Sequence, residues 1–524
     1  MQFKPYLVVS AALALAVGSW GPARADGDAT ATVRRAVDAV GGADALRAVK
    51  TVTLQGTAKH WEPDQSIEAG GEQRFLDDAT MTIAIDVGTG SMRVDWDRSF
   101  QYPFVVKKKY SEVFADGAGY VHYDGGAPAD RAMSGYRLAA EQRELSRGSP
   151  VFLLGLLDHP DRLRALPKQQ VNGRALDAVA YRQGVVDYVV MFDGAGHLPA
   201  RIRVRDEDGL RGDSNFDLVL GGWAQEGGIQ VAHELVRELN GRPVEWLKLD
   251  QVAINPALPA DRFAIPAAVK ASAPRQETSE IPYQWYLRRH YLGLLTDSDA
   301  MFYDSADSQG LKLVELGRGV EHVVGGSHNN MIVEMKNYLV VFEAPIDERQ
   351  SRWVIAAAKA KFPGKPIKYL VLTHHHMDHT SGARTYVAEG ATVIVPSPDK
   401  AFFAKAFAAP HTIDRDALQR HPRKAEIIEV ADMLKISDGD REIGIYRIDA
   451  KHVDGMLIMQ IPDTKLVFVT DLYSPVRDVR GNPNQGDLIA GLEKWRLTPE
   501  ILAGGHGGSG PFADLLKMQS ASAN

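Results

Sequence analysis

The sequence contains no cysteine among its 524 residues. This absence excludes disulfide bonds, cysteine-ligated zinc, iron–sulfur clusters and thiol nucleophiles, and it excludes a lipid anchor on an N-terminal cysteine. Any metal ion must therefore be held by histidine and carboxylate side chains. The absence also suits an exported protein, because no part of the fold then depends on the redox state of its compartment.

The sequence also lacks a block of like charges and an apolar segment long enough to cross a membrane. Its 60 basic and 67 acidic residues are interspersed and give a formal net charge of −7. A nucleic-acid-binding surface usually concentrates Lys and Arg, so we expect no nucleic-acid partner. The apolar run at residues 6–17 (YLVVSAALALAV) is well short of the roughly 20 residues that span a bilayer, and no later segment qualifies.

The first 25 residues have the features of a secretory signal peptide. Lys4 places a positive charge before the apolar run, and Ala23-Arg24-Ala25 has the small-x-small pattern of a cleavage site. We predict cleavage after Ala25 and a periplasmic or secreted protein. An uncleaved membrane anchor is the alternative.

Residues 26–266 are predicted to form a β-rich domain. The whole chain has 45% hydrophobic and 24% charged residues, a composition typical of globular proteins. Its 524 residues suggest two to four domains at about 150 residues each. Short segments such as 51–57, 80–86 and 244–252 alternate apolar and polar residues, which indicates antiparallel strands with one solvated face. We expect short helices at 32–49 and near 150–157. The histidines of this region are isolated, and we assign them no chemistry: His60, His122, His159, His197 and His233.

Residues 267–300 are predicted to be a linker with a connecting helix at 281–295, and residues 301–524 to be a second domain. Apolar strands at 311–316, 331–335 and 338–342 precede a helix at 348–361 and a buried strand at 367–373. Strands that alternate with helices indicate a layered domain, so the whole chain is expected to be α+β.

A dense group of metal-ligand side chains follows the last of these strands directly. The sequence THHHMDHTSG at 373–382 places His374, His376, Asp378 and His379 within six residues. They cannot share one helical face, but a loop at the end of a strand can arrange them around two ions. Imidazole and carboxylate ligands suit zinc, and also iron or manganese.

Three further candidate ligands come later in the chain. His452 and Asp471 each follow an apolar strand, and His506 lies in the sequence AGGHGG, where glycines allow close backbone approach. Taken singly, each of these three residues is as easily explained by a structural role as by metal binding. Together with the first four residues they predict one metal centre.

The HxHxDH motif followed by His, Asp and His in this order resembles the metallo-β-lactamase fold superfamily, over residues 311–513. The resemblance implies an αβ/βα sandwich with two divalent ions, zinc in the first place and iron or manganese as alternatives. It implies that His374, His376 and His452 hold one ion. It also implies that Asp378, His379 and His506 hold the other, that Asp471 bridges both, and that His375 is not a ligand.

Asp471 indicates which branch of this superfamily the sequence resembles. True β-lactamases carry cysteine or serine at this position, whereas a bridging aspartate resembles the glyoxalase II, lactonase and phosphodiesterase branches. The resemblance implies hydrolysis of an ester-like bond (lactone, thioester or phosphodiester) in a small-molecule substrate. The nucleophile would be a hydroxide that bridges the metals, oriented by Asp378 as the catalytic residue. Ser381 departs from the family, in which a second glycine is common before Gly382.

Two alternatives remain open at this point. A mononuclear iron sulfur dioxygenase of the same fold would need only two histidines and a carboxylate. A binding protein with a vestigial metal site is the other, because residues 39–52 and 255–266 weakly resemble the curved β-sheet domains of periplasmic lipoprotein-sorting proteins. That resemblance implies an apolar ligand in the N-terminal domain.

Three other features have less certain roles. Tyr473 is a possible donor to the substrate, although a packing role is the more common one for such a tyrosine. The SHNN sequence at 327–330 precedes a core strand and is a possible border of the pocket, although a structural turn is the expected role. Residues 409–436 look like an insertion that could cover the site, with His411 and His421 on its surface.

Overall fold

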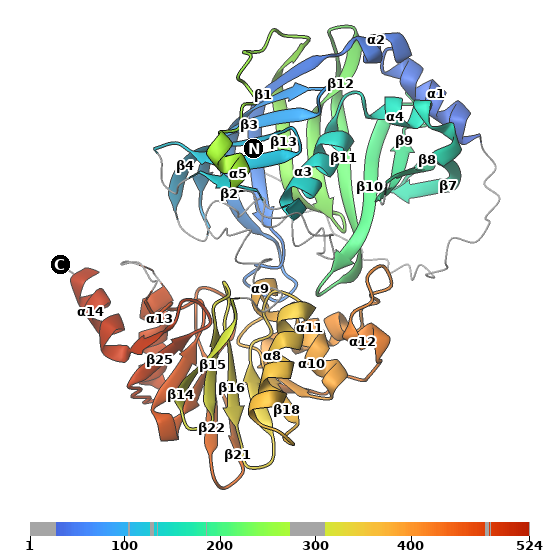
Figure 1. The fold of residues 1–524 in the computed structure, drawn as a ribbon. Helices are drawn as coiled ribbons and strands as arrows, with labels where there is room; N and C mark the ends of the chain where they lie inside the picture. Colours follow the sequence, from blue (N-terminus) through green and yellow to red (C-terminus); the bar gives the residue numbers. More distant parts are fainter. Residues whose placement is uncertain are drawn as a thin grey trace, which may run out of the picture.

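The computed structural model describes residues 28–102, 105–125, 130–133, 135–184, 186–272, 310–476, 482 and 484–522. The predicted signal peptide and the predicted helix at 281–295 lie outside the described residues. The predicted α+β fold class is confirmed, with a large antiparallel sheet in the N-terminal part of the chain and two further sheets in the C-terminal part (Figure 1).

The N-terminal sheet has 13 strands, and each is antiparallel to its neighbours. Strands β1 to β6 form one half and β7 to β13 the other, and the halves join where β1 pairs with β13. The alternating apolar pattern produces this sheet because it buries every second side chain, as in β3. The strands are β1 (Thr51–Glu62), β2 (Arg74–Asp86), β3 (Ser91–Phe100), β4 (Val106–Ala115), β5 (Ala118–Tyr123), β6 (Arg131–Ala132), β7 (Leu163–Val171), β8 (Arg174–Gln183), β9 (Val186–Phe192), β10 (Pro199–Asp208), β11 (Gly212–Glu226), β12 (Ile229–Leu239) and β13 (Arg242–Ile254).

Helices cover the buried face of this sheet (Figure 1). They are α1 (Ala29–Ala39), α2 (Ala43–Ala48), α3 (Gly135–Gly148) and α4 (Phe152–Asp158), and a short α5 (Ala267–Ala271) follows the sheet. Asp28 caps α1, because its side chain accepts a hydrogen bond from the amide of Ala31. The expected helices at 32–49 and 150–157 correspond to α1, α2 and α4. Helix α3 was not expected, although its Leu, Ala, Glu and Arg residues are good helix formers.

The C-terminal part contains two sheets packed face to face. A seven-stranded sheet runs in the order β14 to β20, and a six-stranded sheet runs from β21 to β26. Their strands are β14 (Lys312–Gly317), β15 (Val320–Val324), β16 (Asn330–Glu334), β17 (Leu339–Phe342), β18 (Ile367–Val371), β19 (Thr392–Pro396), β20 (Ile427–Val430), β21 (Met433–Ser437), β22 (Glu442–Ile448), β23 (Met456–Ile461), β24 (Leu466–Val469), β25 (Ile501–Gly504) and β26 (Ser509–Pro511). Buried side chains from both sheets form one apolar layer between them, which includes Phe342 and Phe468.

Helices lie on the outer face of each sheet and complete an αβ/βα arrangement. Helices α8 (Glu348–Lys361), α10 (Ala383–Glu389), α11 (Lys400–Ala408) and α12 (Ala417–Arg420) pack on the first sheet, and α13 (Asn484–Lys494) and α14 (Phe512–Ser522) pack on the second. Helix α8 has the bounds predicted for it, and the Asp347 side chain caps its first turn. None of the described helices combines the length and the apolar composition that a membrane-spanning helix requires.

The segment 409–436 does not simply cover the site. It crosses from one sheet to the other, since β20 pairs with β19 and β21 pairs with β22. The expectation that His411 lies on the surface is wrong: it is 1% exposed, with Nδ1 2.8 Å from Oε1 of Glu207. The next residue, Thr412, donates its amide hydrogen to Asp213 of β11 at 2.7 Å. This part of the segment therefore attaches the C-terminal domain to the N-terminal sheet.

Candidate metal centre

The histidine-rich loop begins where the parallel strand β18 ends. The amide of Thr373 donates to Oε1 of Glu343 at 2.8 Å, and the short helix α9 (Met377–Thr380) follows. The amide of Ala344 donates to the carbonyl of His379 at 3.0 Å, which ties the loop to the end of β17. Two adjacent strand ends thus hold the motif, as expected for ligands at the edge of a parallel sheet.

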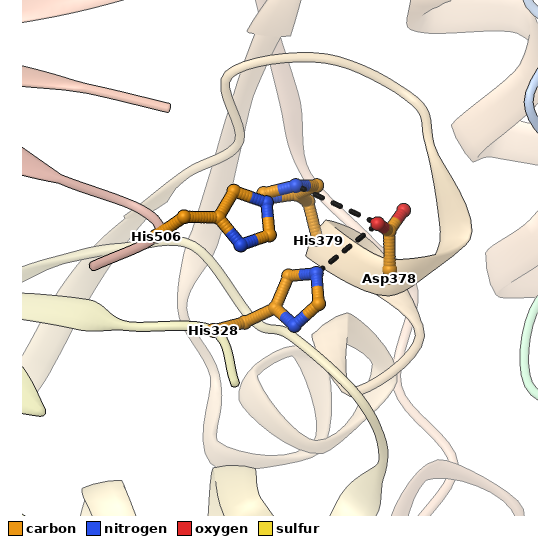
Figure 2. A group of neighbouring side chains, drawn as sticks. All are labelled: His328, Asp378, His379 and His506. Atoms are coloured by element: carbon orange, nitrogen blue, oxygen red, sulfur yellow. Dashed lines mark hydrogen bonds and ion pairs between the residues drawn. The ribbon is translucent and has the colours of Figure 1, made fainter. Parts of the chain in front are cut away.

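The structure brings all seven predicted ligands together in two adjacent groups and adds an eighth residue. In each group the candidate ligand atoms lie within 4.8 Å of one another. One group contains His374, His376, His452 and Asp471. The other contains His328, Asp378, His379 and His506, and Figure 2 shows the three imidazoles and the carboxylate directed toward one another.

Asp471 belongs to the first group, lies two residues after the end of β24, and also contacts the second group. Its Oδ2 is 2.8 Å from Nε2 of His452, and its Oδ1 is 2.7 Å from Nε2 of His506 and 2.9 Å from Nε2 of His379. Each oxygen of this one carboxylate thus faces a different group. One carboxylate is thus in contact with candidate ligands of both groups.

The centre is buried on one side and open on the other. His374, His376 and His379 have no exposed surface. In contrast, the side chains of Asp378 and His506 are 19% and 25% exposed. The exposed surface of the centre therefore belongs mainly to the second group.

Most of the imidazoles have one ring nitrogen turned to an oxygen acceptor or hydroxyl outside the groups. Nδ1 of His374 lies 2.9 Å from the Thr373 hydroxyl, and Nδ1 of His506 lies 3.2 Å from the Ser327 carbonyl. Such outer partners orient an imidazole and leave the opposite nitrogen facing the metal. The same holds for the following contacts: His328 Nδ1 with the Ser327 hydroxyl, His376 Nε2 with the Ser66 carbonyl, and His379 Nδ1 with Glu343.

Glu343 and His328 were missed by the sequence analysis. Glu343 is fully buried, and its Oε2 lies 2.6 Å from Nδ1 of His379. His328 belongs to the SHNN sequence, for which a turn was favoured over a border of the pocket, and its Nε2 lies 3.1 Å from Oδ2 of Asp378. Ser327 and His328 lie in a bend, whereas Asn330 begins β16, and the side-chain amides of Asn329 and Asn330 donate to the carbonyls of Gly504 and Glu343. The only sequence signal for His328 was one histidine before a buried strand.

His375 and Tyr473 lie outside both groups. Nε2 of His375 is 2.9 Å from the carbonyl of Ser66, and its Nδ1 is 3.4 Å from Asp399. Tyr473 is 2% exposed and packs in an apolar cluster under α13 and α14. The packing role therefore accounts for Tyr473.

The charges at the centre favour a bound cation. Burial would raise the pKa of Asp471, but the surrounding imidazoles, above all that of His379, hold it well below its ordinary value. Burial lowers the pKa of His374 to about 3. Burial also opposes protonation of His379, but Asp471 and Asp378 outweigh it and raise the pKa of His379 well above its usual range. A protonated His379 therefore supplies positive charge to the two carboxylates, a role that a bound divalent cation would also fill.

The donor atoms fit divalent metal ions. Nε2 of His374 is buried without a hydrogen-bond partner among the described residues, and Oδ2 of Asp471 lies 3.4 Å away. A buried polar atom left without a partner is costly unless a ligand satisfies it. Nitrogen and carboxylate donors of this kind suit zinc, iron or manganese.

A large cavity between the N-terminal sheet and the C-terminal domain is a separate feature. Its volume is about 990 Å³, and it is lined by β7–β10 on one side and by α8, α10 and α12 on the other. It touches Met377 and Ser381 but no residue of either metal group. The cavity is therefore not the opening of the metal centre.

Comparisons with known proteins concern the C-terminal part of the chain. A family model described as "Metallo-beta-lactamase superfamily" matches residues 323–506, about a third of the chain, and this stretch is a metallo-β-lactamase superfamily domain. No protein with a curated description matches the chain significantly.

Solved structures that resemble the chain include three metallo-β-lactamases. The DIM-1 enzyme is 16% identical, with a TM-score of 0.31, and the match covers 41% of this chain and 97% of that one. TMB-1 is 18% identical, with a TM-score of 0.31 and the same coverage. The metallo-β-lactamase from Pontibacter korlensis is 16% identical, with a TM-score of 0.33 and coverage of 41% and 99%.

Proposed function

We propose that the protein is a dinuclear metal-dependent hydrolase of an ester-like bond, a lactone, a thioester or a phosphodiester, in a small-molecule substrate. The observation that carries the proposal is the carboxylate of Asp471, whose two oxygens face different ligand groups at 2.7–2.9 Å. Two divalent ions held there would activate a water molecule and polarise the substrate carbonyl or phosphoryl oxygen. We expect zinc, with iron or manganese as alternatives.

The side chains of the second group have distinct roles in this proposal. Asp378 is a partly exposed carboxylate on the open side, so it can accept a hydrogen bond from the attacking water and orient it. His506 lies on the same side and borders the position of the substrate. His379 is buried and held by Glu343, so its role is ligation rather than contact with substrate.

The choice of an ester-like bond rests on residue 471. An aspartate at this position resembles the glyoxalase II, lactonase and phosphodiesterase branches, whereas β-lactamases carry cysteine or serine there. Localisation in the periplasm or outside the cell remains part of the proposal, on the basis of residues 1–25. An apolar ligand for the N-terminal region remains a prediction that rests on resemblance alone.

The test is elemental analysis of the purified chain together with a panel of ester, lactone, thioester and phosphodiester substrates. We expect two zinc-like ions per chain and hydrolysis of at least one substrate. Asp471→Asn should retain the fold but lose at least 100-fold in kcat/KM, because the carboxylate that faces both groups is removed. Asp440→Asn is the matched control, since Asp440 is exposed and its side chain forms an ion pair with the exposed Lys336 at 3.6 Å.

Two results would contradict the proposal. Full activity of Asp471→Asn would show that the two groups do not act together. One iron ion per chain, with oxygen consumed in the presence of a persulfide and no hydrolysis, would favour the dioxygenase instead. The complete second group argues against that alternative, because a mononuclear site does not need His379 and His506.

A further inference from the structure

A segment of the N-terminal region reaches the metal centre in the C-terminal domain. It is the β1–β2 connection, residues 63–73, visible in Figure 1 as the blue loop that extends from the sheet toward α9. Nε2 of Gln65 donates to Oδ1 of Asp378 at 2.7 Å. The carbonyl of Ser66 lies 3.1 Å from Nε2 of His376. One candidate ligand of each group is therefore contacted by this connection.

The β1–β2 connection is held in place from both parts of the molecule. Asp64 forms an ion pair with Arg211 of the β10–β11 turn, and Arg242 donates to the carbonyl of Gly71 at 2.6 Å. From the C-terminal domain, the amide of Asp454 donates to the carbonyl of Ile67 at 2.8 Å. Gln65 and Ser66 are each only 4% exposed. These contacts hold the connection on both sides of Gln65.

The hydrogen bonds of Gln65 determine which way its amide points. The hydroxyl of Tyr102 donates to Oε1 of Gln65 at 2.7 Å, so the oxygen end of the amide faces Tyr102. The NH₂ end must then face Asp378, whose ionised carboxylate can only accept. This occupies Oδ1 of Asp378 and leaves its Oδ2 toward His328 and His379, at 3.1 and 3.8 Å.

Ser66 sets the tautomer of His376 in a similar way. A backbone carbonyl is only an acceptor, so the contact requires a hydrogen on Nε2 of His376. Nδ1 then carries the lone pair and faces Nε2 of His452 at 3.1 Å, within the first group. A main-chain atom of the N-terminal region thus prepares one ligand, while the Gln65 side chain orients another.

We propose that Gln65 is a positioning residue of the metal centre, which holds Asp378 through the chain Tyr102–Gln65–Asp378 in the orientation that binds the ion of the second group. The proposal deepens the proposed function and rests on it only in requiring that the centre binds metal. It gives the N-terminal region a part in the chemistry, since a residue 313 positions away in the sequence orients Asp378.

The test measures metal affinity in the full chain with Gln65→Leu, by competition with a chromophoric chelator during titration with Zn²⁺ and with Co²⁺. Loss of an outer partner of a metal ligand typically weakens affinity 10–100-fold. We expect a loss of this size for one of the two ions and affinity within about twofold of wild type for the other. The ligand-field absorption of Co²⁺ in the weakened site should change as well. Glu68→Gln is the control on the same connection, since Glu68 is exposed, and it should match wild type.

Tyr102→Phe keeps the test decisive if Gln65→Leu does not fold. It removes only the hydroxyl that orients Gln65 and retains the ring under Arg74. We expect the same ion to be weakened, by roughly threefold to tenfold, which is less than the loss of the outer partner itself. Wild-type affinity for both ions in Tyr102→Phe, or in a folded Gln65→Leu, would overturn the proposal.

The metal titration tests the role of Gln65 independently of whether the protein is a hydrolase. A wild-type protein that binds two ions but hydrolyses no substrate would contradict the hydrolase, and the titration would still decide the role of Gln65. An active wild-type enzyme with unchanged metal affinity in the Gln65 and Tyr102 variants would contradict the positioning role alone.

Discussion

At the scale of single residues, Glu343 shows how the backbone is adapted to the metal centre. It has a φ angle of 67°, in the left-handed region that non-glycine residues seldom adopt. In this conformation its carboxylate reaches both the amide of Thr373 and Nδ1 of His379. An unfavourable backbone conformation persists only where the surroundings compensate for it, and these two hydrogen bonds supply part of that compensation.

Glu343→Gln should therefore impair the centre although Glu343 is not a candidate ligand. The amide cannot match the negative charge that supports the N–H of His379, so we expect metal affinity and kcat/KM to fall about 10–100-fold. Chelator competition and steady-state kinetics measure the two quantities. Glu315→Gln, at an exposed carboxylate near Lys361, should leave both unchanged. Unaltered affinity in Glu343→Gln would show that Glu343 acts only on the backbone.

At the scale of secondary-structure elements, buried charges join the strands of the N-terminal sheet. Asp77 of β2 lies between His60 of β1, at 2.8 Å, and Arg98 of β3, and none of the three side chains is more than 1% exposed. Burial alone would raise the pKa of Asp77, but His60 and Arg98 lower it to about 2. The register of three adjacent strands thus places a charged network where its groups satisfy one another.

The stability of the N-terminal sheet should fall in acid because of Asp77. Its folded-state pKa is about 2, below the ordinary value of 3.8. Its contribution of about 2 kcal/mol is therefore complete above about pH 4 and is lost as the pH falls toward 2. Denaturant unfolding of wild type and Asp77→Asn between pH 6 and 2 measures this. The stability difference between the two proteins should shrink through this window, and a difference independent of pH would contradict the assignment.

Much of the element structure could be predicted from the sequence, because alternation and helix caps act locally. Helix α8 has its predicted bounds, since Asp347 and the apolar spacing that follows it are both local signals. The edge strands β20 and β21 were instead taken for an insertion. Whether a short, partly polar strand pairs depends on the neighbour that the fold supplies, here β19 and β22.

At the scale of the whole molecule, the metal centre lies where the N-terminal region meets the C-terminal domain. Arg74 of β2 donates to the carbonyl of His452 at 2.8 Å, and Ile346 and Met377 extend the apolar core of the N-terminal sheet. Contacts from the N-terminal region thus support candidate ligands in both groups. Metal binding and the association of the two parts are expected to stabilise each other.

Removal of the metal ions should therefore lower the unfolding temperature of the full chain. The folded state alone assembles both ligand groups, and an ion present at 100 times its Kd stabilises that state by about 2.7 kcal/mol. Calorimetry with and without a chelator should show a lower Tm that added Zn²⁺ restores. Asp471→Asn should respond less to the chelator. An unchanged Tm after complete metal removal would contradict this coupling.

The sequence by itself determined the fold class and identified seven candidate ligands, from His374 to His506. Both depend on local features, the spacing of apolar residues and ligand side chains placed at the ends of apolar strands. Only the tertiary structure decided that His328 joins the second group, that Glu343 supports His379, and that Gln65 and Ser66 reach the centre from another part of the molecule. The physical reason is that these contacts join residues far apart in the chain, and no local pattern specifies which distant side chain will fill a given position around a ligand.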